Sequence, residues 1–86
     1  MEILQAYERA ADLDRVVRAY QNDVVNETQV YVALAYCNQA ANQAWEIYRR
    51  QGCTAADDAA AAADEAVLRA EKALERRLVG AGEPRP

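Results

Sequence analysis

An 86-residue chain has room for one domain, and this one has few large core side chains, because alanine supplies much of its 52% apolar content and phenylalanine none. Its net charge of −4 argues against a duplex-binding role, which needs clustered lysine and arginine for the phosphates. The lack of histidine removes the usual general base at neutral pH and the commonest metal ligand.

The first expected helix covers residues 2–25. Its apolar side chains recur at spacings of three and four, the period of a helix with one buried face. The stripe consists of Ile3, Ala6, Tyr7, Ala10, Leu13, Val17, Tyr20 and Val24. Asp12 and Asp14 interrupt it, and either could cap a second helical piece, but the stripe keeps its phase across them. We therefore expect one continuous helix, with Arg18 placed four residues after Asp14 to pair with it.

The second expected helix covers residues 27–51. Asn26 followed by Gln29 resembles a capping box, and Gly52 supplies the left-handed residue that ends a helix. Residues 28–45 of this helix carry no charge. Two apolar rows run along it: Val30, Leu34, Cys37, Ala41, Ala44 and Tyr48 in one, and Ala33, Tyr36, Ala40 and Ile47 in the other. Such a wide apolar arc predicts a helix enclosed on most sides, by its own chain or by a partner.

The third expected helix covers residues 55–79. Thr54, with Asp57 three residues later, predicts its beginning, and Gly80 predicts its end. The inner stripe is Ala56, Ala60, Ala63, Val67, Ala70, Leu74 and Leu78. Its first half is almost all alanine, so a neighbouring backbone can approach closely. Residues 80–86 have no periodicity and are expected to form a disordered tail.

Short links between three long helices predict antiparallel neighbours. We therefore expect an all-α fold, an antiparallel up-down-up three-helix bundle over residues 1–79 with the second helix in the centre. Dimerisation along that helix is an additional expectation, because a domain this small gains modest stability from its own core. Residues 1–5 show no signal peptide, and the amides within residues 28–45 exclude a membrane span. The protein is expected to be soluble and cytoplasmic.

The sequence offers little for catalysis or metal binding. Cys37, in the middle of the second helix, has apolar and amide neighbours, so a structural role is the better interpretation. Cys53 precedes the third helix, whose N-terminus favours a thiolate, but no partner base is available. Glu71 and Glu75 have a spacing that suits a cation, yet Arg69 and two further basic residues are there to neutralise them. We expect no catalytic residue, no metal site and no cofactor.

Two surfaces are candidates for partner binding. The first is a row of acids with one leucine on the third helix: Asp57, Asp58, Asp64, Glu65, Leu68, Glu71 and Glu75. Such a row attracts a basic surface, although outward acids are also ordinary on soluble helices. The second is a set of aromatic and amide residues on the second helix: Tyr31, Tyr36, Asn38, Asn42 and Trp45. These residues either seal the seams of the core or form a dimer or partner surface.

The function expected from these features is that of a non-catalytic protein-binding module. It would be an adaptor or inhibitor that occupies a basic, nucleic-acid-binding surface of a partner protein, without binding nucleic acid or membrane itself. Antitoxins, immunity proteins and phage-encoded inhibitors of host defence, such as anti-CRISPR proteins, share its small size, acidity and lack of catalytic residues. No motif matches any one of these families, so the analogy rests on size and charge. The alternative is a structural or assembly protein whose role is its own homo-oligomer.

Overall fold

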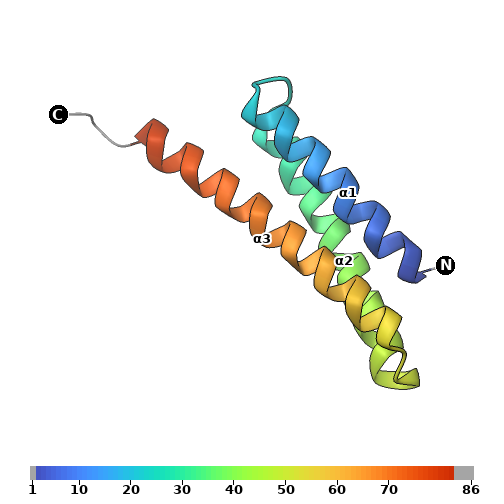
Figure 1. Ribbon diagram of the computed structural model, residues 1–86. Coiled ribbons are helices and arrows are strands. Elements are labelled where there is room, and N and C mark those ends of the chain that lie inside the picture. The colour runs from blue at the N-terminus through green and yellow to red at the C-terminus, as the bar shows by residue number, and fades with distance from the viewer. Residues whose placement is uncertain (1, 83–86) are drawn as a thin grey trace.

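Three α-helices make up most of the computed structural model, which describes residues 2–82 and, within them, the side chains of residues 3–77. They are α1 (Glu2–Gln21), α2 (Glu27–Gln51) and α3 (Thr54–Gly82), and no strand occurs in this part of the chain. The chain reverses direction at both connections, so α1 and α3 run the same way and α2 runs against them (Figure 1). The fold is the predicted all-α three-helix bundle.

Each helix contacts both of the others, so the three form a triangular bundle. The expectation that α2 lies in the centre of the bundle is therefore wrong. Of the two alternatives for enclosing α2, its own chain or a partner, the first does not hold. In a triangle each helix turns one side to its neighbours and the opposite side to solvent. Much of the charge-free segment 28–45 is exposed, at Thr28, Gln29, Tyr31, Val32, Ala35, Tyr36, Asn38, Gln39, Asn42 and Trp45. Burial within one chain thus does not explain why this side of α2 is uncharged.

α1 is continuous, but it ends at Gln21, four residues earlier than the sequence predicted. Asp23 adopts a left-handed conformation with φ 61°. The amide of Val24 donates to the carbonyl of Ala19 at 2.8 Å. The amide of Asp23 donates to the carbonyl of Tyr20 at 3.1 Å, which completes a Schellman motif. Aspartate can replace the usual glycine because its short polar side chain tolerates this conformation. Val24, expected in the buried stripe, is consequently 75% exposed.

Arg77 of α3 fastens this end of α1. Its guanidinium donates to the carbonyl of Tyr20 at 2.8 Å and to the carboxylate of Asp23 at 2.6 Å. The same group lies over the Tyr20 ring, 4.7 Å from its centre. The hydrogen bond to Asp23 raises the pKa of Arg77. One side chain of α3 therefore holds both the last turn of α1 and the loop that follows it.

Both ends of α2 are capped as the sequence predicted. The side chain of Asn26 accepts a hydrogen bond from the amide of Gln29 at 3.3 Å, and the Gln29 side chain accepts one from the amide of Asn26 at 3.1 Å. These two bonds form a capping box. At the other end Gly52 is left-handed, with φ 63°, and its amide donates to the carbonyl of Tyr48 at 2.7 Å. The length of α2 is therefore determined by local hydrogen bonds at both ends.

α3 begins one residue earlier than predicted, at Thr54. The carbonyl of Cys53 accepts the first helical bonds, from the amides of Ala56 and Asp57 at 3.0 and 3.3 Å. A residue whose carbonyl accepts the first helical bond occupies the N-cap position. Cys53 therefore takes the place that the sequence assigned to Thr54.

α3 also extends further than predicted, through Gly80 to Gly82. A glycine inside a helix costs only about 1 kcal/mol relative to alanine, so Gly80 permits a helix end without imposing one. The first residues of the expected disordered tail are thus helical. The remaining residues of that tail, 83–86, lie outside the described part of the chain.

The core is built mainly from small side chains. Its buried members on α3 are Ala56, Ala59, Ala60, Ala63, Ala66, Ala70, Ala73 and Leu74. Those at 59, 66 and 73 lie beside the predicted stripe and are buried because two helices cover α3. Among the described side chains, the largest that are fully buried are Leu13, Val30 and Cys37. Alanine lets helices approach closely, but each alanine buries about 1–2 kcal/mol less than a leucine would.

Some members of the predicted stripes lie outside this core. Tyr7 of α1 and Tyr36 of α2 are exposed, and Val67 of α3 is half-buried. The side chain of Leu78 lies outside the described residues. A tyrosine can stand at the edge of a buried stripe because its ring covers apolar neighbours while its hydroxyl stays in water. The periodicity therefore locates the buried side of each helix more reliably than its margins.

Candidate functional site

The acids predicted on the third helix lie on the outer side of α3. We call this set the acidic ridge, and it comprises Asp57, Asp58, Asp64, Glu65, Leu68, Glu71 and Glu75. Asp57 is half-buried and the other members are exposed. The buried alanines occupy the opposite side of α3, which is why the ridge faces outward. Among the described side chains, none of the ridge carboxylates takes part in an ion pair.

Arg69 of α3 points to α1 and away from the ridge. It donates two hydrogen bonds to the carboxylate of Asp14, at 3.0 and 3.2 Å. The hydrogen bond to Asp14 raises the pKa of Arg69, while burial opposes the effect. The predicted pairing of Asp14 with Arg18 is therefore wrong, because Asp14 pairs with Arg69 instead. Arg69 likewise forms no ion pair with Glu71 or Glu75.

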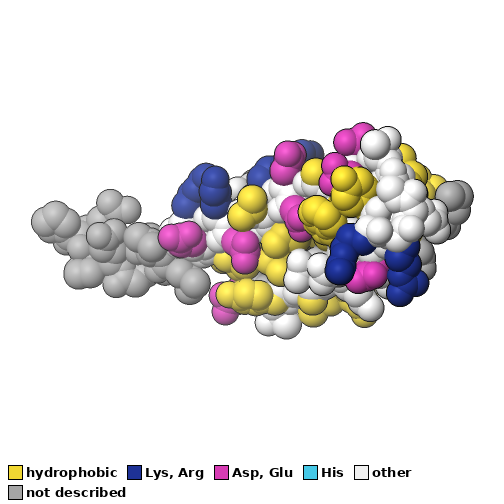
Figure 2. Space-filling view, turned by 90° about the horizontal axis from the view of Figure 1, so that it is seen from below, with side chains coloured by type: hydrophobic (Ala, Val, Ile, Leu, Met, Phe, Trp, Pro, Cys, Tyr) yellow, Lys and Arg dark blue, Asp and Glu magenta, His cyan; other side chains and the backbone are white. Residues whose placement is uncertain are grey.

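Leu68 is the apolar member of the acidic ridge. Its side chain is 55% exposed, and it lies one helical turn from both Asp64 and Glu71. Figure 2 shows a face of the molecule on which acidic and hydrophobic side chains intermingle. An apolar side chain among acids can be buried by a partner while the acids remain at the solvated rim. The ridge thus combines a charged rim with one possible anchor.

The aromatic and amide residues predicted on the second helix do not form one surface: four share one side of α2, whereas Tyr36 lies about 160° around the helix from Asn38, beside the groove between α1 and α2. All of them are exposed: Tyr31, Tyr36, Asn38, Asn42 and Trp45. The ring of Trp45 meets that of Tyr48 edge-on, with centroids 5.6 Å apart. The guanidinium of Arg9 lies 5.1 Å from the centre of the Tyr36 ring. These contacts hold the rings at the surface, where they leave substantial area open to a partner.

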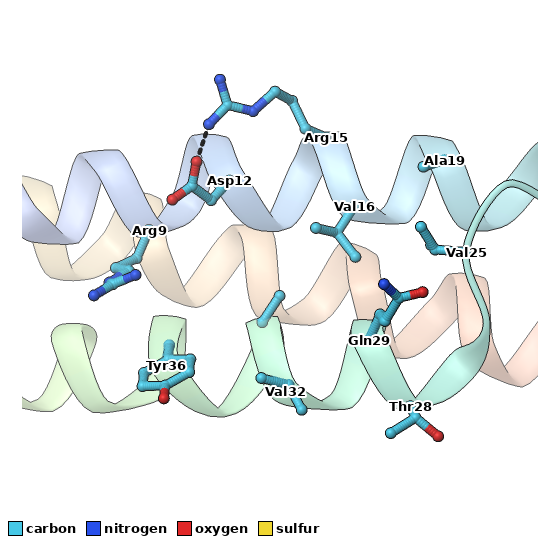
Figure 3. A pocket seen from close by; sticks show the side chains of 11 residues that line it. Arg9, Asp12, Arg15, Val16, Ala19, Val25, Thr28, Gln29, Val32 and Tyr36 are labelled. Atoms are coloured by element: carbon cyan, nitrogen blue, oxygen red, sulfur yellow. Dashed lines mark hydrogen bonds and ion pairs between the residues drawn. The ribbon is translucent and has the colours of Figure 1, made fainter.

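An open groove between α1 and α2 was not predicted. It has a volume of about 500 Å³, and its apolar lining comes from Val16, Ala19, Val25, Val32 and Ala33. Figure 3 shows Val16 pointing from α1 toward α2, where Val32 lies. The adjacent valines Val16 and Val17 were the available signal, because consecutive apolar residues widen the apolar arc of a helix. The groove could accept an apolar side chain, and its polar lining includes Arg9, Asp12 and Arg15.

Cys37 makes structural contacts. Its thiol is buried and donates to the carbonyl of Ala63 on α3 at 3.4 Å. Burial raises the pKa of the Cys37 thiol, and the negative charges of Asp14 and Asp64 add to the effect. A thiol that is enclosed and held protonated is a poor nucleophile. Cys53 is half-buried, and both cysteines are free thiols.

Within residues 2–82, no three side chains of the acidic or cysteine type are grouped so that they could hold a metal ion. None of the described helices has both the length and the apolar character that crossing a bilayer requires. No known protein family, curated protein or solved structure matches the chain. The candidate site therefore consists of two surfaces found by geometry, the acidic ridge of α3 and the uncharged outer side of α2.

Proposed function

We propose that the protein is a non-catalytic protein-binding module that acts by covering a basic surface of a partner protein. The observation that supports this most directly is the acidic ridge, whose carboxylates project without ion pairs around the exposed Leu68. A protein surface that binds nucleic acid offers the matching positive charge. Occupying that surface blocks it without any chemical step.

Charge and apolar contact have separate roles in this proposal. The ridge carries six carboxylates, and α3 also carries four basic residues, all of them after Leu68. The negative field is therefore strongest along residues 54–68, which hold four of the carboxylates and no basic residue. Such a field accelerates association with a basic surface, and its effect weakens as salt is added. Burial of the remaining exposed part of Leu68 contributes less than the roughly 1.5–3 kcal/mol of a full leucine. The acids therefore set the association rate, and Leu68 slows dissociation.

This mode of action suits several kinds of inhibitor. Antitoxins and immunity proteins cover a toxic partner, and phage-encoded inhibitors such as anti-CRISPR proteins cover an effector that binds nucleic acid. Within this set we favour the second kind, because a row of carboxylates along a helix resembles a row of phosphates in its charge. The protein would compete with nucleic acid for the same basic groove.

Charge reversal on the ridge tests the proposal. The partner is captured from host lysate, identified by mass spectrometry, and titrated calorimetrically with the wild-type chain and with Asp57→Lys/Asp64→Lys/Glu71→Lys. We expect binding to weaken at least tenfold, about 1.4 kcal/mol, with loss of its salt dependence. Leu68→Ala should raise the dissociation rate and leave the association rate unchanged.

A matched control reverses three acids outside the ridge, Glu8, Asp12 and Glu46, and so produces the same net charge. The control should retain most of the wild-type affinity, because its new lysines lie on α1 and α2. Equal losses in the two variants would show that net charge, and not the ridge, determines binding. Unchanged affinity in the ridge variant would contradict the proposal.

A further inference from the structure

The outer side of α2 carries a symmetric arrangement of side chains. Counted from Asn38, the aromatic residues Tyr31 and Trp45 stand seven residues away on either side. Glu27 and Arg49, which have opposite charges, stand eleven residues away on either side. Seven and eleven residues are close to whole numbers of helical turns, so these five side chains fall within about 40° of one another around the helix. We call this set the α2 strip.

The bundle leaves the α2 strip accessible. Tyr31 is 49% exposed and Trp45 is 41% exposed. Asn38 and the two charged ends of the strip are exposed as well. Arg49 is held only by a long, exposed contact of 3.4 Å to Glu46. Its guanidinium is therefore free to pair with a carboxylate on another molecule.

The charge pattern of the strip restricts what can cover it. Residues 28–45 carry no charge, so a strongly basic or acidic partner would lose hydration there without gaining ion pairs. A second copy of the same surface brings no like charges together over this whole length. At the two ends, a second copy supplies the opposite charge that each end needs. The surface that complements the strip best is the strip itself.

We propose that the α2 strip is a homodimer interface, in which two copies of α2 pack antiparallel about a two-fold axis at Asn38. Tyr31 of each copy then meets Trp45 of the other. The two Asn38 amides, each both donor and acceptor, hydrogen-bond to one another on the axis. Glu27 of each copy lies beside Arg49 of the other. The aromatic, amide and charged groups of the strip are all matched within one contact.

The end charges select the antiparallel arrangement. Parallel helices would place Glu27 against Glu27 and Arg49 against Arg49, which is repulsive at both ends. A second exposed row beside the strip is symmetric about nearly the same point, because the pairs Ala35 with Asn42 and Thr28 with Arg49 are both centred between residues 38 and 39, half a residue from Asn38. Two neighbouring rows supply the width over which helices pack. α2 is roughly 37 Å long, so the contact can extend along the whole helix.

Sedimentation equilibrium of the full chain tests the interface. In about 0.15 M salt the Debye length is about 8 Å, so the net negative charges of two copies are screened. We expect a reversible dimer with a dissociation constant below about 100 μM. Asn38→Lys places two lysines on the two-fold axis and should raise this constant at least tenfold. Gln39→Lys adds the same charge about 100° further around α2, at the edge of the contact, and should weaken the dimer less than Asn38→Lys does.

A charge exchange tests the pairing of the ends. Glu27→Arg alone and Arg49→Glu alone each bring like charges together twice in the dimer, and each should weaken it at least threefold. The double variant Glu27→Arg/Arg49→Glu restores opposite charges and should return the dissociation constant to within twofold of wild type. Loss of helix stability at the ends of α2 would add up in the double variant and would not be rescued. Circular dichroism verifies that every variant remains helical.

Three results would overturn the proposal. A wild-type chain that stays monomeric at about 1 mM has no such interface. The α2 strip would then be a binding surface for a different protein. A dimer that tolerates Asn38→Lys as well as it tolerates Gln39→Lys does not have its axis at Asn38. A double variant that is as weak as the single variants rules out the antiparallel pairing of Glu27 with Arg49.

Discussion

The acidic ridge and the α2 strip are exposed rows of side chains, one on α3 and the other on α2, and they differ in their pattern of charges. The ridge presents carboxylates of one sign around a single apolar side chain, Leu68. The strip presents two aromatic rings and an amide, with one negative and one positive end. A row of like charges repels its own copy, whereas the strip complements its own copy. We therefore propose a basic partner for α3 and a second chain for α2.

Both surfaces are possible on so small a bundle because the interior is made of small side chains. The alanines of α3 let all three helices contact one another, and each helix buries only one of its sides in the core. The outer sides of α2 and α3 are then available for recognition. A core made mainly of alanine has few large buried side chains, so the stability of the bundle depends strongly on each of them.

The largest effect is expected from a core substitution that destabilises the whole bundle, because unfolding removes both surfaces together. Leu13 is fully buried, and Leu13→Ala should lower the free energy of unfolding by about 2–5 kcal/mol, because the site loses apolar contact and gains a cavity. Urea denaturation followed by circular dichroism at one fixed protein concentration measures the loss. Leu4, which is 57% exposed, supplies the control, since Leu4→Ala should change stability by less than about 0.5 kcal/mol. Similar losses at the two positions would place the core elsewhere.

The next effect separates the two surfaces. The ridge reversal Asp57→Lys/Asp64→Lys/Glu71→Lys should weaken partner binding at least tenfold and leave the dimer intact. Asn38→Lys should weaken the dimer at least tenfold and leave the association rate with the basic partner unchanged. Sedimentation equilibrium and binding kinetics of the same two variants measure both quantities. If either variant loses both activities, the ridge and the strip are not separate surfaces.

A smaller effect is expected at the turn between the two helices that carry these surfaces. Gly52 has φ 63°, and a Cβ there would meet nothing within 4 Å, so the cost of a side chain is conformational alone. Gly52→Ala should therefore destabilise the bundle by about 1 kcal/mol. Gly52→Asn should cost less, because asparagine tolerates the left-handed conformation. Thermal unfolding of the two variants ranks them, and a larger loss for asparagine would contradict this explanation.

The smallest effect concerns Cys37, which lies where α2 packs on α3. Burial raises the pKa of its thiol in the folded state, whereas an unfolded cysteine ionises near about 8.5. The unfolded chain therefore loses its proton first, and the stability from this site falls as pH rises above about 8.5. Denaturation at pH 7.5 and 9.5 should show a smaller decline in Cys37→Ala than in wild type or in Cys53→Ala. Equal declines in all three would show that Cys37 does not cause the dependence.

Local signals predicted much of the fold. Asn26 and Gly52 cap α2 because capping depends on residues that are adjacent in sequence, and the small inner residues of α3 follow from its period. The end of α1 was not predictable in the same way, because Asp23 stands where glycine is usual and is held by Arg77, 54 residues away. Pairings such as that of Asp14 with Arg69 also depend on which helix lies opposite.

The candidate surfaces were only partly predictable for the same reason. Periodicity placed the acidic ridge outward correctly, since the outside of one helix can be found from that helix alone. It could not show that the uncharged side of α2 faces solvent, because that depends on where α1 and α3 sit around it. The groove beside Val16 and Val32 lies between two helices, so the apolar periodicity of either helix alone does not reveal it.

Disulfide mapping of the dimer tests the central claim that the uncharged side of α2 meets its own copy antiparallel. In a Cys53→Ser background, a mixture of chains carrying Ala35→Cys and chains carrying Asn42→Cys is oxidised gently. A disulfide requires Cα atoms within about 7 Å, so only facing positions are linked. We predict that links between residue 35 of one chain and residue 42 of the other predominate. Links of 35 to 35 and 42 to 42, or no links at all, would contradict the claim.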